Sequence, residues 1–298
     1  MLAVAVAQTG CVSSNRIALA PTAMSGLKSV AVAATVSQPE LGAEVLRSNT
    51  PVPVTGGGFI GGFIAGAVVS MIDSTIEAKR AKSAESDITP VRDALVDFSA
   101  PEALRAALAT QLQDGGSPFP VTSVYLAEAK DGAAIRKLTT SSKTNAILLI
   151  STDYHLTTEF ESIRVLARVR LITPQSARND NAVPDLYTNE FATYRNLPMH
   201  SGSGRIAAAT AWASDKGAMA REAMISCFTE LAAMIRFDLA QGAEANTPPK
   251  ESLTSSAPAT GRIGAVAGSR LAIKGMIARQ QGDRKWVRLQ TGELSSTE

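Results

Sequence analysis

The chain has very few of the side chains that usually bind metals or form disulfides. Its 298 residues include only two cysteines and two histidines. Cys11 and Cys227 lie far apart in the sequence, which excludes a disulfide-dense scaffold and a cysteine-rich zinc site. His155 and His200 lie on different segments, and no Cys-x2-Cys or His-x3-His spacing occurs. We therefore expect neither a transition-metal site nor a metal cofactor.

Aromatic residues and net charge are also scarce. Aromatic residues make up 5% of the chain and apolar residues 45%, so a core is expected that is built mainly from Ala, Val, Ile and Leu. The formal net charge of +2 is too small to indicate nucleic acid or an anionic surface as partner. The sequence also lacks the basic, aromatic-interleaved groove of single-strand binders. No nucleic-acid partner is predicted.

The first eleven residues, MLAVAVAQTGC, are typical of a lipoprotein processing site. Residues 1–7 are apolar, and Gly10 then precedes Cys11, the residue that would take the acyl chains. The apolar run is short for a signal peptide and has no Lys or Arg before it, which a start codon assigned too late would explain. We predict a signal and lipidation region at residues 1–11. The alternative is an apolar terminus with an incidental cysteine.

An uncharged glycine-rich run, TGGGFIGGFIAG at residues 55–66, is the most unusual stretch of the sequence. On a helix, Gly58, Gly62 and Gly66 form one stripe, and such a stripe lets another helix approach closely. We predict that these glycines pack against a membrane or a partner helix. Packing on the protein's own sheet and a loop are alternatives. An inner-membrane span at residues 54–72 is another.

The same glycines formally match the G-x-G-x-x-G pattern of dinucleotide-binding folds. That pattern must directly follow a core strand and be followed by a second strand that ends in an acid. Here Pro51 and Pro53 precede it, and proline is unfavourable in a central strand. A charged helical pattern occupies the place of the second strand. No nucleotide or other cofactor is therefore predicted.

The remaining pattern predicts an α/β fold (an α+β arrangement) with a mixed sheet packed by helices. Predicted strands are residues 29–36, 121–127, 146–150, 162–173 and 186–194. Predicted helices are a glycine-rich helix at 56–84, helices beginning near residues 90 and 100, a short one at 133–141, and a long one at 214–242. Along residues 162–173, apolar residues alternate with Arg164, Arg168 and Arg170, which we expect on a solvated face.

This pattern predicts two folded regions joined by a linker. Residues 29–242 form one α/β envelope domain. Residues 243–260 are rich in Pro, Ser, Thr and Ala and are expected to be a linker. Residues 261–298 have the turns of a small β-meander, which we expect to fold as an independent appendage.

No catalytic residue is predicted. The stretch HSGSG at residues 200–204 does not have the spacing of a nucleophile elbow, and it is interpreted as a surface loop. Asp153, Glu159 and Glu161 could form a carboxylate pair, but the sequence gives no distance between them. A non-enzymatic role is therefore expected. The alternative is an envelope hydrolase that uses residues within 153–204.

The chain resembles bacterial envelope lipoproteins that have a glycine-rich helix after an early strand. Its middle is similar to curli-secretion-type lipoproteins and to the amino-terminal domain of TolB. The residues that carry the resemblance are Gly10 and Cys11, 30–36, 56–66, 145–173, 194–196, Trp212 and the long helix. It implies an α/β envelope domain that can oligomerise, with no catalytic residue to carry over. With Cys11, we expect a lipid-anchored protein on the periplasmic face of the outer membrane that forms a homo-oligomer or binds another envelope protein. The weak signal and the extra carboxy-terminal meander depart from that pattern.

Gly62→Leu tests the predicted glycine stripe. If this face is packed, the variant should lose roughly 1–3 kcal/mol of stability or its oligomerisation, because the added side chain pushes the partner surface away. On a free or lipid-facing helix, leucine should instead add roughly 0.8 kcal/mol through helix propensity. Thermal unfolding and crosslinking in membranes or detergent measure both effects. A variant equal to wild type in both assays removes the packing stripe.

Overall fold

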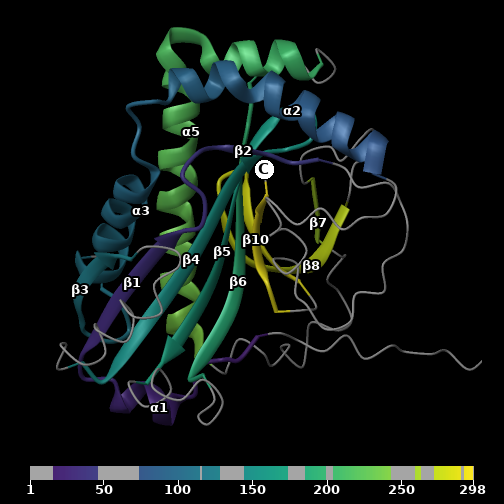
Figure 1. The fold of residues 1–298 in the computed structure, drawn as a ribbon. Helices are drawn as coiled ribbons and strands as arrows, with labels where there is room; N and C mark the ends of the chain where they lie inside the picture. Colours follow the sequence, from purple (N-terminus) through teal and green to yellow (C-terminus); the bar gives the residue numbers. More distant parts are fainter. Residues whose placement is uncertain are drawn as a thin grey trace, which may run out of the picture.

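The computed structural model has a single mixed sheet with helices packed on it (Figure 1). The structure describes residues 16–45, 74–114, 116–127, 144–173, 185–198, 204–242, 259–262, 272–289 and 292–297. This confirms the predicted α/β fold and the carboxy-terminal strand meander.

Several predictions lie outside the described residues. They concern Cys11, the glycines Gly58, Gly62 and Gly66, the short helix at 133–141 and the loop at 200–204 except Gly204. Among the described residues, no helix has both the length and the apolar composition that crossing a membrane requires. The alternative of a span at residues 54–72 lies outside them as well.

The described elements have the following bounds. The helices are α1 (Pro21–Gly26), α2 (Ser74–Ala94), α3 (Ala100–Leu108) with its π-helical continuation η2 (Ala109–Asp114), and α5 (Arg205–Gln241). The strands are β1 (Val30–Val36), β2 (Gly42–Ala43), β3 (Val121–Leu126), β4 (Ala146–Leu156), β5 (Ser162–Ile172), β6 (Tyr187–Asn196), β7 (Ala259–Arg262), β8 (Ala272–Gln281), β9 (Arg284–Leu289) and β10 (Leu294–Thr297).

The ten-stranded sheet brings distant parts of the chain side by side. Its strand order is β3-β1-β4-β5-β6-β10-β9-β8-β7, with β2 paired to β4. β1 runs parallel to both β3 and β4, whereas β4, β5 and β6 form an antiparallel meander. β10 pairs in parallel with β6 and antiparallel with β9. Parallel neighbours require long crossover connections, and here the crossover from β1 to β3 contains α2 and α3.

The main core lies between the sheet and α5, with α3 packed beside α5 and α2 lying across its end (Figure 1). β5 shows how the sequence builds this layer, because successive side chains of a strand point to opposite faces. The core-facing set of β5 is Ile163, Val165, Ala167, Val169 and Leu171, all buried. The predicted apolar face of this strand is confirmed.

Arg164 departs from the predicted solvated face of β5. Arg168 and Arg170 are exposed, as expected, but Arg164 is buried, with 4% of its surface accessible. Alternation in sequence assigns a residue to a face, and it does not reveal whether other parts of the chain cover that face. The prediction that this face of β5 is exposed to solvent is therefore wrong at Arg164.

Two helices differ from the predicted boundaries. α2 does not end at residue 84 and restart at Pro90 but runs to Ala94 with Pro90 inside it. Its buried residues Ala84, Ile88 and Val91 share one face, so packing outweighs the cost of the proline. The helix predicted to begin near residue 100 is confirmed as α3, and the side chain of Ser99 caps it by accepting a hydrogen bond from the backbone N–H of Glu102.

α5 begins earlier than predicted and contains a break. Helical residues start at Arg205, and the backbone leaves helical geometry between Ser214 and Gly217. A second helical segment begins after this break. The hydroxyl of Ser214 does not cap that segment, because it donates to the carbonyl of Ala211. Gly217 has φ +72°, and a Cβ there would lie 3.2 Å from the carbonyl oxygen of Ala94. The break therefore lets α5 pack closely on the end of α2.

The carboxy-terminal meander is part of the main sheet, contrary to the predicted independent appendage. β10 pairs with β6 at Leu294↔Phe191 and Ser295↔Ala192. Trp286 and Leu294 belong to the same buried cluster as the residues that pack on α5. A Pro/Ser/Thr-rich composition indicates a connection between elements, but it does not determine whether the strands beyond it dock.

Cleavage of the chain between residues 243 and 258 tests this docking. With a specific protease site placed there, we expect the carboxy-terminal piece to stay bound after cutting, because β10 pairs with β6 and β9 packs on α5. Size-exclusion chromatography should show both pieces in one peak in native buffer and two peaks in denaturant. Separation of the pieces in native buffer would show that the meander is an independent unit after all.

Buried ion pairs on helix α5 as the candidate functional site

Two acidic residues of α5 lie in the core against the sheet. Glu230 has 8% of its surface accessible and Asp238 has 0%. They are eight residues apart, so both fall on the broad stripe of the helix that faces the core. A buried carboxylate is costly unless it is paired and hydrogen-bonded, and both of these are.

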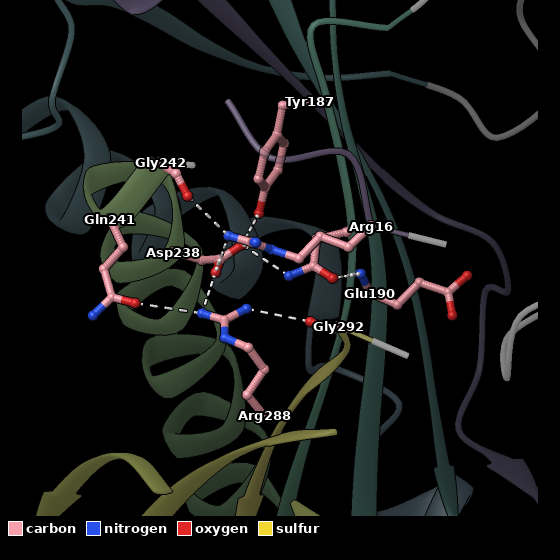
Figure 2. A network of polar contacts seen from close by, with 9 residues as sticks. Arg16, Tyr187, Glu190, Asp238, Gln241, Gly242, Arg288 and Gly292 are labelled. Carbon is pink, nitrogen blue, oxygen red and sulfur yellow. Dashed lines mark hydrogen bonds and ion pairs between the residues drawn. The ribbon is translucent and has the colours of Figure 1, made fainter. Parts of the chain in front are cut away.

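Asp238 accepts hydrogen bonds from four side chains (Figure 2). Arg16 Nη2 lies 3.1 Å and Arg288 Nη2 2.5 Å from its Oδ1. The hydroxyl of Tyr187 donates to Oδ2 at 2.6 Å, and the amide of Asn189 donates to Oδ2 at 2.8 Å. Both carboxylate oxygens thus accept hydrogen bonds, from donors on the segment before α1, on β6 and on β9.

The two arginines extend this network to the backbone. Arg16 Nη2 donates to the carbonyl oxygen of Gly242 at 3.3 Å, and Arg288 Nη1 donates to that of Gly292 at 3.2 Å. Arg288 Nη2 also reaches Gln241 Oε1 at 3.5 Å. Cations are favourable at the carboxyl end of a helix, where Gln241 and Gly242 lie. We call Arg16, Tyr187, Asn189, Asp238 and Arg288 the Asp238 network.

The charge state of the Asp238 network is fixed. Burial favours a raised pKa for Asp238, but Arg288 and Arg16 outweigh it and hold the pKa below its usual value. Burial, together with the neighbouring Asp238 carboxylate, raises the pKa of Tyr187 well above its usual value. Near neutral pH the site therefore holds one carboxylate, two guanidiniums and a neutral phenol. This arrangement suits a permanent structural contact between α5 and the sheet, which we call the clasp.

Glu230 makes a second set of contacts two turns earlier on α5. Both Arg195 and Arg284 donate to its Oε2, and Trp286 Nε1 donates to Oε1 at 3.0 Å. Arg195 Nε also donates to the hydroxyl of Ser226 at 2.7 Å. Glu230 thus joins α5 to β6 and β9, as Asp238 does.

The donors follow the strand period. Arg284, Trp286 and Arg288 alternate along β9, so they share one face of the strand, and each of them donates to a carboxylate of α5. The sequence did not predict this arrangement. The signal was present as Glu230 and Asp238, two acids that fall among the apolar residues of the core-facing stripe of the helix, since a charge there must find a partner.

The structure places Asp153 on β4, and Glu159 and Glu161 in the connection between β4 and β5. Burial lowers the pKa of His155 to about 3, with Arg164 adding to the effect, so this histidine is neutral. Burial raises the pKa of the Cys227 thiol to about 12, so this thiol stays protonated and packs as a core residue. Among the described residues, no group of three or more His, Cys, Asp or Glu side chains could hold a metal ion.

No protein-family model matches the chain, and no curated protein matches it.

Asp238→Asn should strongly destabilise the protein. The substitution leaves two buried guanidiniums with a neutral partner, and breaking a buried pair in this way costs about 3–5 kcal/mol. Chemical denaturation at neutral pH measures the loss. The difference between wild type and variant should shrink as the pH falls below about 4, because the lowered pKa of Asp238 contributes stability only while the group is ionised.

Glu102→Gln is the matched control for this measurement. Glu102 pairs with Arg105 at 2.8 Å on the surface, and both side chains are about half exposed. Exposed pairs contribute at most about 1 kcal/mol. If Asp238→Asn costs no more than this control, the Asp238 network does not hold the fold together.

Proposed function

We propose that this protein is a non-catalytic, lipid-anchored component of the bacterial cell envelope, on the periplasmic face of the outer membrane. Its role is structural or accessory, in assembly or secretion. The observation that carries the proposal is the position of Arg16. This residue follows Cys11 by only five positions, and its side chain is locked in the buried ion pair with Asp238.

The short connection between these residues defines the geometry of anchoring. Five residues span at most about 18 Å when fully extended. An acyl chain on Cys11 would therefore hold Arg16 within about that distance of the membrane. α1 and the carboxyl end of α5 lie at the same end of the body (Figure 1), so this end would face the lipid. Such a tether suits a protein that acts at the membrane surface.

The buried charges support a structural role. Glu230 and Asp238 are both used to fasten strands to α5, with arginines as partners. General acid–base catalysis works best when a group titrates near the operating pH. The pKa values of Asp238, His155 and Cys227 are all shifted away from neutrality, so these three groups keep one protonation state near neutral pH. Glu293 differs from them, because burial raises its pKa to about 7.

Cys11→Ala tests the anchor. In cells that express the gene with its natural upstream region, we expect the variant to move from the membrane fraction to the soluble periplasm. The mass of the membrane-extracted wild type should exceed that of the variant by its acyl chains. Cell fractionation and intact mass spectrometry measure both changes.

Cys227→Ala provides the matched control, because its thiol is buried in the core and should carry no lipid. This variant should stay in the membrane fraction with full acylation. A Cys11→Ala protein that remains membrane-bound at the mass of the wild type would rule out the anchor. If it remains membrane-bound while wild type carries no acyl mass, the alternative of a span at residues 54–72 is favoured.

A further inference from the structure

Strand β3 forms one edge of the sheet. It is the first strand in the strand order, and among the described strands it pairs only with β1 (Figure 1). A strand at a sheet edge presents a row of backbone N–H and C=O groups to any extended chain that approaches it. The edge of β3 is therefore a surface to which another strand can add.

The backbone groups that face outward from β3 belong to Val124 and Leu126. The N–H of Ala127 donates to the carbonyl of Ala34 at 2.8 Å, so the backbone of Ala127 faces β1. Both backbone groups of a residue in a parallel strand point to the same side, and this side alternates from one residue to the next. The backbone of Tyr125 thus faces β1 as well, whereas Val124 and Leu126 present their donors and acceptors to the outside.

The side chains of β3 divide between the two faces of the sheet. Val124 and Leu126 are partly buried and pack against the main core. Tyr125 points to the other face, in register with Ala33. Its side chain is exposed, with 40% of the residue's surface accessible. An exposed aromatic ring therefore lies beside the outward backbone groups.

The edge lacks the features that usually keep an outer strand from pairing. Proteins protect such strands with charged residues, prolines or bulges. The sequence of β3, VTSVYL, contains no charged residue and no proline. Its register does shift, but the shift lies between Val121 and Ser123. The strand from Ser123 to Leu126 is regular and is suited to further pairing.

We propose that β3 pairs with β3 of a second copy of this chain, in antiparallel orientation about a twofold axis at Tyr125. In this register Val124 of each copy lies opposite Leu126 of the other, and each such pair exchanges both of its N–H···O bonds. The outward donors and acceptors of these residues are then all used. The two Tyr125 side chains lie directly opposite each other, and the two sheets become one continuous sheet.

The absence of charge is the reason to assign this edge to a second copy. A twofold axis places each side chain near its own equivalent, so a charge on the strand would face a like charge, which is destabilising. β3 carries no charge that could do so, and aromatic pairs across antiparallel strands are stabilising. A charged partner strand would find no complementary charge here. The pairing is short, so we expect a dimer that dissociates on dilution.

A cysteine at position 125 tests the register. Opposite Cα atoms in a pair of this kind are about 4.5 Å apart, which is within the range of a disulfide. Tyr125→Cys should therefore form a covalent dimer under mild oxidation. All variants are made in a Cys11→Ala background, so that the outcome does not depend on the proposed anchor and the remaining native thiol, Cys227, is buried. A non-reducing gel and intact mass spectrometry measure the dimer.

Ser123→Cys in the same background is the matched control. Ser123 lies on the same face of β3 as Tyr125. In the proposed register, however, the two Ser123 positions are separated along the strands by roughly 13 Å, too far for a disulfide. Covalent dimer from Tyr125→Cys alone supports the pairing. Equal amounts of dimer from both variants, or none from Tyr125→Cys, overturn it.

Tyr125→Lys tests the dimer without a crosslink. Sedimentation equilibrium of the parent protein should show the mass rising from one chain to two as its concentration increases. The variant should remain a monomer over the same range, because the two ammonium groups would face each other. Its thermal unfolding in dilute solution should match that of the parent, since Tyr125 is exposed.

Val96→Lys is the matched control for this measurement. Val96 lies just beyond α2 with 87% of its surface accessible, so the change also replaces an exposed apolar side chain by lysine. This variant should dimerise as the parent does. A parent that stays monomeric throughout, or a Tyr125→Lys protein that dimerises equally, overturns the proposal. Dimerisation that is lost in Gly62→Leu but kept in Tyr125→Lys also overturns it, and assigns the contact to the glycine stripe.

Discussion

The structure depends on one buried carboxylate that must be surrounded by donors. Asp238 is fully buried and faces two guanidiniums, Arg16 and Arg288. The desolvation cost of such a cluster is offset only when every polar atom has a partner in good geometry. The amino-terminal segment, β6, the end of α5 and β9 each provide a partner (Figure 2). These four parts of the chain therefore meet at one carboxylate. The network ties the segment before α1 and the carboxy-terminal meander to the end of α5.

The two buried carboxylates of α5 are held in the same way. Each has two cationic partners, which are Arg195 and Arg284 for Glu230 and Arg16 and Arg288 for Asp238. Because a guanidinium stays charged at all ordinary pH values and the pKa of Asp238 is lowered, the ion pairs of Asp238 persist near neutral pH. The pairs on α5 therefore fasten strands β6 and β9 to the helix permanently.

The parts of the fold that could be predicted from the sequence are those set by local periodicity. The alternation of β5, the capped start at Ser99 and the pairing of neighbouring strands β5 and β6 depend on residues close together in the chain. The Asp238 network joins residues up to 222 positions apart, and no local pattern encodes which arginine pairs with which acid. The burial of Arg164 and the docking of β10 were missed for the same reason, because both depend on what a distant segment covers.

The Asp238 network also relates the proposed anchor to the carboxy-terminal meander. Arg16 follows Cys11 by five positions, and Arg288 donates to the carbonyl of Gly292, two residues before β10. Both arginines bind the same oxygen of Asp238. If Cys11 is acylated, the tether therefore enters the body at a residue that is fixed in the core beside the last strands of the sheet. The same carboxylate would then hold both the tethered segment and the meander at the carboxyl end of α5.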